Sequence, residues 1–508
     1  MKAICRCIHG IALTMFALCT TAAFAAPAAP QDHLDRDDAR FLLERTGFTP
    51  SPRETAAYVG LTREQAVDRL LASARSTATT PLPAWFEEPI PAPQVQRKWT
   101  PEDRRAQQTV RGEWYQDARG WWVREMLVTP SPLTERMTMF WHNHFVSGQD
   151  KVPWPQTMLA QNVLLRRDAL GNFGTMLHDV AKDPAMLQYL DGASNRKGHP
   201  NENFAREVME LFTLGEGHYT QHDVAEAARA FTGWGLDDSL HYVWRPAAHD
   251  NSPKTVFGKM ANLDGDQMLD LLLARPETAN FVTAKLWREF ISDTPDPAQV
   301  ASMADAFRAS HYGIRTVLRV MFLSQAFWDQ QGEGTLARSP VDFVIGTLRS
   351  FEVGYGSTQH LSDTLRGLGQ DVYEPPNVKG WPGGQTWINS TTLLARERFV
   401  EAVLRSSGTR AAGAMKPSPA SRPGEPGMVA PVAMKPAPPR PAGDGLHFDP
   451  ARWLAEQNIS PIGVPDAITR MRLVRTVLPT RPVEPVSPDD DGQAMLQTLL
   501  TDPAYQLK

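Results

Sequence analysis

Apolar residues recur at helical spacing along most of the chain. Phe204, Val208 and Leu211, for example, fall on one stripe of a helix that would begin after Asn201. Alternation typical of strands is short, and residues 240–257 are the best candidate for a small β-hairpin. The predicted fold class is therefore mainly α, a multi-helix globular body with long loops. The periodicity predicts helices within 35–75 and over 102–128, 132–145, 156–170, 172–181, 202–214, 221–232, 264–274, 277–290, 297–309, 313–324, 340–351, 359–367 and 390–405.

The first 25 residues have the pattern of a secretory signal peptide. Lys2 and Arg6 supply a positive start, an apolar run follows over 11–18, and 23–25 offer small residues for cleavage. We therefore expect residues 1–25 to be removed and the protein to be exported, to the periplasm or beyond the cell. No other apolar run reaches the ~20 residues that a membrane-spanning helix needs, so no membrane span is expected.

Composition divides the remaining chain into three regions. Residues 35–405 form the helical body, and residues 408–446 are rich in Pro, Ala and Gly. A segment of that composition cannot bury enough apolar surface to fold, so we expect a disordered insertion there. Residues 449–507 return to helical spacing. Because Trp453 and Leu496 need cover, this short helical tail is expected to pack on the body.

The charge and the cysteine content exclude several classes of protein. The formal net charge is -5 and no basic stripe is evident, which argues against a nucleic-acid partner because phosphate binding needs clustered Lys and Arg. The three cysteines, Cys5, Cys7 and Cys19, all lie in the segment that we expect to be removed. The mature chain would then hold no disulfide, iron–sulfur cluster or covalent haem. The common zinc-protease, nucleophile-elbow, phosphate-loop and dinucleotide motifs do not occur.

Two histidines two residues apart, His142 and His144, are the first candidates for chemistry. On a helix their side chains lie about 200° apart, so His144 should face the core and His142 a polar pocket or the surface. Joint binding of a divalent metal would require the helix to break near His142. The alternatives are two structural histidines, or one histidine that acts as a catalytic group or a single ligand.

The segment 201–212 carries two candidate catalytic carboxylates, Glu202 and Glu207. Glu207 borders the apolar stripe, and burial would raise its pKa and suit it to proton transfer. Asn203 and Arg206 are candidates for substrate binding in the same segment. The alternative is a structural role, in which Glu202 and Arg206 belong to a solvated ladder of charges and Glu207 to a buried ion pair.

Two irregular segments complete the set of candidates. His249 and Asp250 lie together after an aromatic stretch, so His249 could be a base and Asp250 a metal ligand, although turn capping by Asp250 is the simpler role. The Pro- and Gly-rich loop at 375–384 leads into a helix. Within it, Lys379 and Trp381 could bind an anionic or flat substrate, or the loop could be purely structural.

Six blocks of sequence occur in an order typical of one bacterial family. They are FWHNHF at 140–145, a long block at 183–234 that includes NENFAREVMELF, HDNSPKTVFG at 249–258, KLWREF at 285–290, SPVDFVIGTLR at 339–349, and a block at 369–396 that includes PPNVKGWPGG. On these blocks the chain resembles the family called domain of unknown function 1800 (DUF1800) over about residues 35–405.

The resemblance implies an exported helical protein. Genes of this family commonly neighbour those of a second family, domain of unknown function 1501 (DUF1501), so an exported DUF1501-like protein is the partner that the resemblance suggests. No catalytic residue is established for the family. The candidates named above therefore rest on their own chemistry.

Two functions remain open from the sequence. The first is a hydrolase-type enzyme, acid/base or metal-assisted, that acts on a cell-envelope or extracellular substrate; it predicts that the candidate side chains converge on one pocket. The second is a non-enzymatic binding or assembly protein that works with an exported partner; it predicts an exposed aromatic patch, for which the 14 tryptophans give material. A redox enzyme with a non-covalent cofactor is a third possibility.

Overall fold

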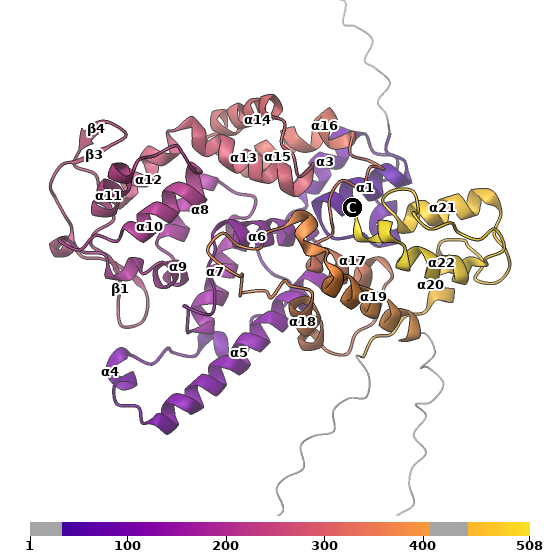
Figure 1. Ribbon diagram of the computed structural model, residues 1–508, viewed down its shortest axis with the longest axis horizontal. Helices are drawn as coiled ribbons and strands as arrows, with labels where there is room; N and C mark the ends of the chain where they lie inside the picture. Colours follow the sequence, from indigo (N-terminus) through magenta and orange to yellow (C-terminus); the bar gives the residue numbers. More distant parts are fainter. Residues whose placement is uncertain (1–32, 407–444) are drawn as a thin grey trace, which may run out of the picture.

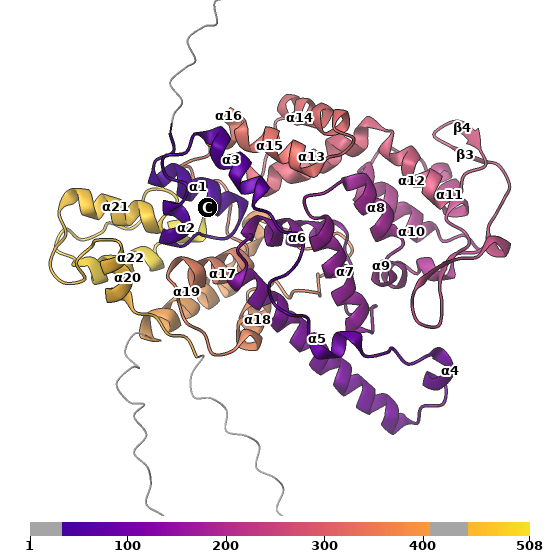
Figure 2. The ribbon, with the colours of Figure 1, turned by 180° about the vertical axis from the view of Figure 1, so that it is seen from behind.

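The computed structural model describes residues 33–406 and 445–508. The structure is 59% helical and the described residues form only two small two-stranded sheets, which confirms the predicted mainly α class. The signal peptide predicted over 1–25 and nearly all of the insertion predicted over 408–446 lie outside the described residues. Figures 1 and 2 show the helices from the front and from behind, with α6 at the centre and the C-terminal helices beside α1.

Short polar side chains and prolines set the starts of the N-terminal helices. Asp35, Ser51 and Thr62 each accept a bond from a backbone N–H of the first turn, and the third helical residue bonds back to the cap. The predicted helical region 35–75 is therefore three helices, and the Pro-rich stretch after it holds two short turns. The elements are α1 (Arg36–Thr46), α2 (Pro52–Ala56), α3 (Arg63–Ala72), η1 (Ala84–Glu87), α4 (Pro93–Gln96) and α5 (Pro101–Val128).

Four helices form the middle of the body. Trp141 of α6 lies in the core, and its indole Nε1 donates to the carbonyl oxygen of Ala169 at 2.9 Å, which ties α6 to the end of α7. Prolines occupy the first turn of three of these helices, where a missing N–H costs nothing. The elements are α6 (Pro132–His144), α7 (Pro155–Asp168), α8 (Phe173–Ala181) and α9 (Pro184–Tyr189).

The next segment holds the strands and one irregular helix. The hairpin predicted near 240–257 is present as two hairpins, with Trp234 opposite Trp244 in the first and Thr255 opposite Met260 in the second. The helix predicted over 202–214 continues past Glu207 as a π-helical turn. The elements are η2 (Gly192–Ser194), α10 (Glu202–Glu207), η3 (Val208–Thr213), α11 (Gln221–Ala230), β1 (Trp234–Leu236), β2 (Tyr242–Trp244), η4 (Pro246–Ala248), β3 (Lys254–Val256) and β4 (Lys259–Ala261).

The tail packs against the last part of the body. Tyr505 Oη lies 2.7 Å from Thr347 Oγ1, and Trp453 Nε1 donates to the carbonyl oxygen of Ser350 at 2.9 Å, so the tail lies against α17. The elements are α12 (Gly265–Leu273), α13 (Pro276–Phe290), α14 (Pro297–Ala309), α15 (Ile314–Leu323), α16 (Gln325–Trp328), α17 (Pro340–Ser350), α18 (Thr358–Gly367), η5 (Gly384–Trp387), α19 (Ser390–Arg405), α20 (Pro450–Glu456), α21 (Ala467–Val477), α22 (Gly492–Thr501) and η7 (Pro503–Gln506).

A fully buried ion pair joins α6 to α7. The guanidinium of Arg166 donates to both oxygens of Glu135, at 2.6 and 2.8 Å, and both side chains are 1% exposed. The indole Nε1 of Trp122 donates to the same carboxylate at 3.0 Å. A buried charge is costly unless its partner is also present. This pair therefore favours the one packing of α6 on α7 in which the two side chains meet.

We predict that Arg166→Met lowers the free energy of unfolding by about 3–5 kcal/mol, because it leaves the carboxylate of Glu135 buried without a counter-charge. The matched control is Arg167→Met in the same helix. Arg167 is 55% exposed and pairs with Asp168, so its loss should cost about 1 kcal/mol or less. Urea unfolding of the two variants measures the difference, and similar losses in both would contradict the argument.

Candidate functional site

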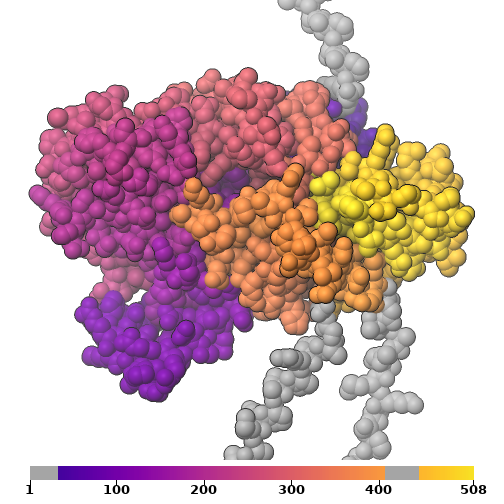
Figure 3. Space-filling model, in the orientation of Figure 1, coloured from indigo at the N-terminus to yellow at the C-terminus, as the bar shows by residue number. Residues whose placement is uncertain are grey.

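A pocket of about 320 Å³ lies where α6, α13, the start of α17 and the loop at 379–387 meet; we call it the central pocket. Figure 3 shows a hollow in this region, between salmon atoms above and orange atoms below, with purple atoms from the first third of the chain at its floor. The lining side chains used below are Arg136, Asn143, His144, Lys285, Arg288, Glu289, Asp293, Asp342, Lys379, Trp381 and Lys508.

Paired charges form one side of this pocket. Arg136 of α6 lies 2.7 Å from Asp342 of α17 and 2.9 Å from Glu289 of α13, and Lys508 Nζ donates to Asp342 at 2.8 Å. Burial alone would raise the pKa of Asp342, but Arg136 and Lys508 outweigh it and hold this pKa well below its usual range. These four side chains are therefore already satisfied by one another.

The loop at 379–387 is held against α6 by a single amide side chain. Asn143 Oδ1 accepts from the backbone N–H of Trp381 at 2.7 Å, and Asn143 Nδ2 donates to the carbonyl oxygen of Trp381 at 3.3 Å. Gly380 has φ +85°, and a Cβ there would collide with Asn143 Oδ1, so only glycine fits. The indole Nε1 of Trp381 is buried and has no hydrogen-bond partner among residues 33–406 and 445–508.

His144 and Lys285 meet at the wall formed by the π-helical turn η3. His144 Nε2 lies 3.1 Å from the carbonyl oxygen of Phe212, which can only accept, so Nε2 carries the hydrogen. Lys285 Nζ lies 3.1 Å from His144 Nδ1 and 3.4 Å from the carbonyl oxygen of Leu211. The free carbonyls at the end of η3 thus hold both side chains in place.

The electrostatics of this pair differ from those of the paired charges. Burial, and then Lys285, lowers the pKa of His144 well below its usual value, so the imidazole is neutral and Nδ1 accepts from the amine. Burial, and then Arg288, lowers the pKa of Lys285 to about 8. No carboxylate of the described chain lies within ion-pair distance of Lys285. No counter-charge therefore stabilises the protonated amine near neutral pH.

His142 does not share this pocket. His144 is buried among aromatic rings, as expected, but the prediction that His142 faces a polar pocket or the surface is wrong. His142 is 0% exposed and lies between the rings of Trp122 and Tyr373, at 4.9 and 5.5 Å. Neither ring nitrogen has a hydrogen-bond partner within the described ranges. His144 is the histidine that reaches the pocket. The face of α6 opposite its core stripe is also buried, because α5 and the loop before the 379–387 segment pack on it. The spacing of apolar residues within α6 cannot show that other elements pack on this face.

The carboxylates of α10 lie outside the central pocket. Glu202 and Asn203 are exposed, and Gln221 links Glu202 to Arg206 through bonds of 2.7 Å to each. Glu207 is partly buried, and burial, and then Glu210, raises its pKa, as expected. Arg206, and then Lys379 and Lys151, oppose that rise, so Glu207 lies within the field of Lys379 although it does not line the pocket.

The remaining candidates fall into two places. His249 Nδ1 donates to the carbonyl oxygen of Thr232 at 2.8 Å, and Asp250 pairs with Arg229 at 2.8 Å while it accepts from the backbone N–H of Ser252 at 2.9 Å. Asp250 therefore closes a turn, as the simpler role required. Lys379 is exposed and pairs with Glu216 at 3.1 Å at the rim of the central pocket.

Of the ten candidate residues, the structure brings only His144, Lys379 and Trp381 to the central pocket. The proposed metal ligands His142, His144 and Asp250 lie in three different environments. Over the described ranges there is no group of three or more His, Cys, Asp or Glu side chains placed to hold a metal ion.

The sequence argument missed the strongest members of the pocket. Lys285 and Glu289 lie four residues apart at the edge of the buried stripe formed by Val282, Leu286 and Phe290. The sequence could have identified this lysine and this glutamate as candidate site residues, since charged residues seldom border a core stripe without a partner. Nothing in the local pattern pointed to Lys508.

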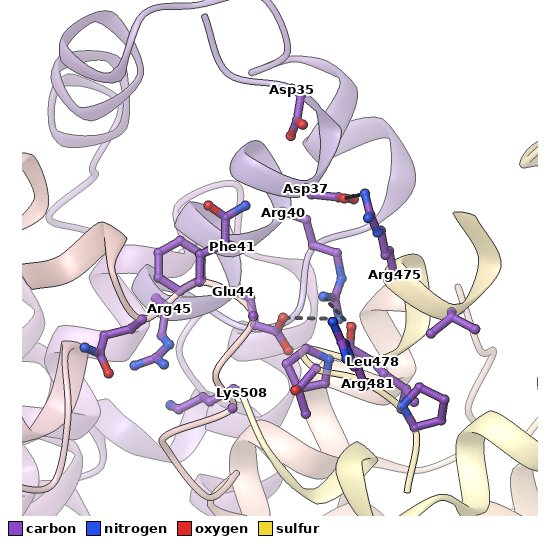
Figure 4. Close-up of a pocket in the computed structure, with 18 of the residues that line it drawn as sticks. Asp35, Asp37, Arg40, Phe41, Glu44, Arg45, Arg475, Leu478, Arg481 and Lys508 are labelled. Carbon is purple, nitrogen blue, oxygen red and sulfur yellow. Dashed lines mark hydrogen bonds and ion pairs between the residues drawn. The ribbon is translucent and has the colours of Figure 1, made fainter. Parts of the chain in front are cut away.

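A second cavity, of about 670 Å³, lies between α1, the loop at 330–334 and the segment 471–482 of the tail (Figure 4). Four of its eight charged side chains pair within its walls: Arg40 with Glu44 at 3.2 Å, and Arg475 with Asp37 at 3.1 Å. It contains none of the sequence candidates. The central pocket, although smaller, is where unpaired donors and four of the six sequence blocks meet.

These features define a helical protein with a central pocket lined by both paired and unpaired charges. The model of the family described as "Protein of unknown function (DUF1800)" matches residues 41–507. The chain belongs to this family, and the match includes the tail beyond residue 405. No curated protein and no solved structure matches the chain. No helix of the described ranges has the length and apolar character to cross a membrane.

We predict that His142 makes the protein less stable as the pH falls. Burial, and then Arg166, lowers the pKa of His142 to about 3 in the folded state, whereas the unfolded chain binds its proton near pH 6.5. The unfolded state therefore gains protons first, and stability is lost below pH 6.5. Between pH 7.5 and pH 5 the loss from this residue should be about 2 kcal/mol.

His142→Phe should remove this part of the pH dependence, because phenylalanine fills the same slot and does not titrate. His218→Gln is the control, since His218 is exposed. Denaturant unfolding at the two pH values measures the slope. The argument fails if His142→Phe leaves the slope unchanged.

Proposed function

We propose that this is an exported enzyme that binds an anionic group of its substrate in the central pocket and uses Lys285 and His144 for acid/base chemistry. The observation that carries the proposal is the contact between Lys285 Nζ and His144 Nδ1, which lies at the pocket and involves no carboxylate. The signal peptide predicted over 1–25 supports a substrate in the cell envelope or outside the cell.

The balance of charge supports an anionic ligand. Five basic side chains and three carboxylates line the central pocket among the described residues. Asp342 and Glu289 are already paired with Arg136 and Lys508, whereas neither the buried amine of Lys285 nor the exposed Arg288 has a carboxylate partner within the described residues. A buried or half-buried cation without a counter-charge is costly, so a bound carboxylate, phosphate or sulfate group would complete the pocket.

The state of Lys285 supports acid/base chemistry. An amine with a pKa of about 8 has both its charged and its neutral form populated near neutral pH, so it can give and take a proton in one cycle. His144 is fixed as the tautomer with a free Nδ1, which faces the amine. Trp381 lines the same pocket, and its buried indole Nε1 has no hydrogen-bond partner among the described residues.

A second function is favoured by a different surface. Large apolar side chains are exposed on the tail, among them Ile462, Ile468 and Val483 at 81%, 78% and 64%. Such a surface suits a non-enzymatic protein that docks on an exported partner, for which a DUF1501-like protein is the candidate from the resemblance. This function predicted an exposed aromatic patch. Among the large apolar side chains that are exposed on the described residues, Trp244 is the only aromatic one.

We predict that inorganic phosphate or citrate binds the mature protein and that Arg288→Gln weakens binding about tenfold, because one charge-assisted contact of about 1.5 kcal/mol is lost. Affinity should also fall as the pH rises through about 8, since Lys285 then loses its charge. Titration calorimetry measures both effects. Arg308→Gln is the matched control, because Arg308 is exposed on α14 outside the pocket. Equal affinities in the two variants would contradict the site.

We predict that Lys285→Met lowers kcat at least about 100-fold on any substrate that the protein turns over, because it removes the acid/base group. The assay uses p-nitrophenyl phosphate, sulfate and acetate, with Arg308→Gln as the control. In the pH profile of kcat/KM, one limb should lie near the pKa of Lys285 at about 8. Anion binding without turnover of any of the three would favour the second function.

A further inference from the structure

The amine of Lys285 has two hydrogen-bond acceptors and no counter-charge. His144 Nδ1 and the carbonyl oxygen of Leu211 lie 3.1 and 3.4 Å from Nζ. The ring of Phe281 lies 4.9 Å away and shields the amine from water on that side. Within residues 33–406 and 445–508, no Asp or Glu approaches Nζ closely enough to hold a proton there.

This arrangement suits a neutral amine better than an ammonium ion. A neutral amine has two N–H bonds and one lone pair, and the two acceptors take the two N–H bonds. The remaining tetrahedral position belongs to the lone pair, and Lys285 lines the central pocket. The lowered pKa agrees with this geometry, since burial and Arg288 both disfavour the charged form.

We propose that Lys285 is a nucleophile that condenses with the carbonyl group of an anionic aldehyde or ketone, such as a 2-oxo acid, in the central pocket. This inference rests on the proposed function, because it uses the same pocket and the same anion-binding side chains. It adds the class of substrate and the atom that attacks it.

The reaction balances without an oxidant or a reductant. The lone pair of Nζ forms a bond to the carbonyl carbon, the second electron pair of the C=O bond moves to the oxygen, and one of the two Nζ protons passes to that oxygen to give a hydroxyl group. The other Nζ proton, for which His144 Nδ1 is the nearest acceptor, passes to the hydroxyl group, which leaves as water. An imine between Lys285 and the substrate carbon remains.

The substrate's anionic group has a partner at the correct distance along the helix. Arg288 lies three residues after Lys285 in α13, so both side chains lie on one face of the helix. Arg288 is exposed, pairs with no carboxylate of the described residues, and donates one hydrogen bond of 3.5 Å to the carbonyl oxygen of Ala284.

The test is trapping of the imine in the mature full-length protein. The protein is incubated with glyoxylate and sodium cyanoborohydride at pH 7, and the modified peptide is identified by mass spectrometry. We expect one carboxymethyl group on Lys285, formed about tenfold faster than on the exposed, ion-paired Lys379, because the neutral fraction of Lys285 is far larger at this pH. The rate should rise with pH up to about 8 and then level off.

Two comparisons separate this inference from the proposed function. Lys285→Arg cannot form an imine, so it should lose the adduct, and phosphate binding is measured separately on the wild-type protein by titration calorimetry. Propanal, which has no anionic group, should label Lys285 about tenfold more slowly than glyoxylate. Labelling of Lys285 no faster than that of Lys379, with phosphate binding intact, would overturn the inference alone. Equal labelling by propanal and glyoxylate, without phosphate binding, would overturn the anion site and leave only a reactive amine.

Discussion

The buried ion pair between Arg136 and Asp342 is the constraint on which the central pocket depends. The two side chains are 6% and 5% exposed and lie 2.7 Å apart. They join α6 to α17, and Glu289 and Lys508 bring α13 and the end of the described chain to the same point. Because each charge is costly without the others, the four segments can meet in only one arrangement. The pocket is the space that this arrangement leaves open.

The central pocket uses two kinds of charged side chain for two purposes. Arg136 and Asp342 are saturated by each other and hold the structure. Lys285 and Arg288 line the same pocket and have no carboxylate partner among the residues that the structure describes. An anion-binding site needs charged side chains without a carboxylate partner. A fold tolerates such side chains only where the surrounding ion pairs and packed aromatic rings already stabilise the structure.

The two histidines of α6 show how one helix can give similar residues different properties. His142 is enclosed between Trp122 and Tyr373 with no partner for either nitrogen, so it is a neutral part of the core. His144 has a carbonyl on one nitrogen and an amine on the other, so its tautomer is fixed and it can take part in proton transfer. The difference comes from what packs on each face of the helix.

The sequence by itself determined the positions of nearly all the longer helices, the mainly α class, the hairpin region, the turn at Asp250 and the raised pKa of Glu207. All of these follow from local periodicity, capping side chains and neighbours a few residues away. Tertiary structure alone decided that His144 meets Lys285, 141 residues apart, and that Arg136 meets Asp342 and Lys508. Those contacts depend on how α6, α13 and α17 pack, and the spacing of residues within one helix contains no information about the charge that another helix brings to it.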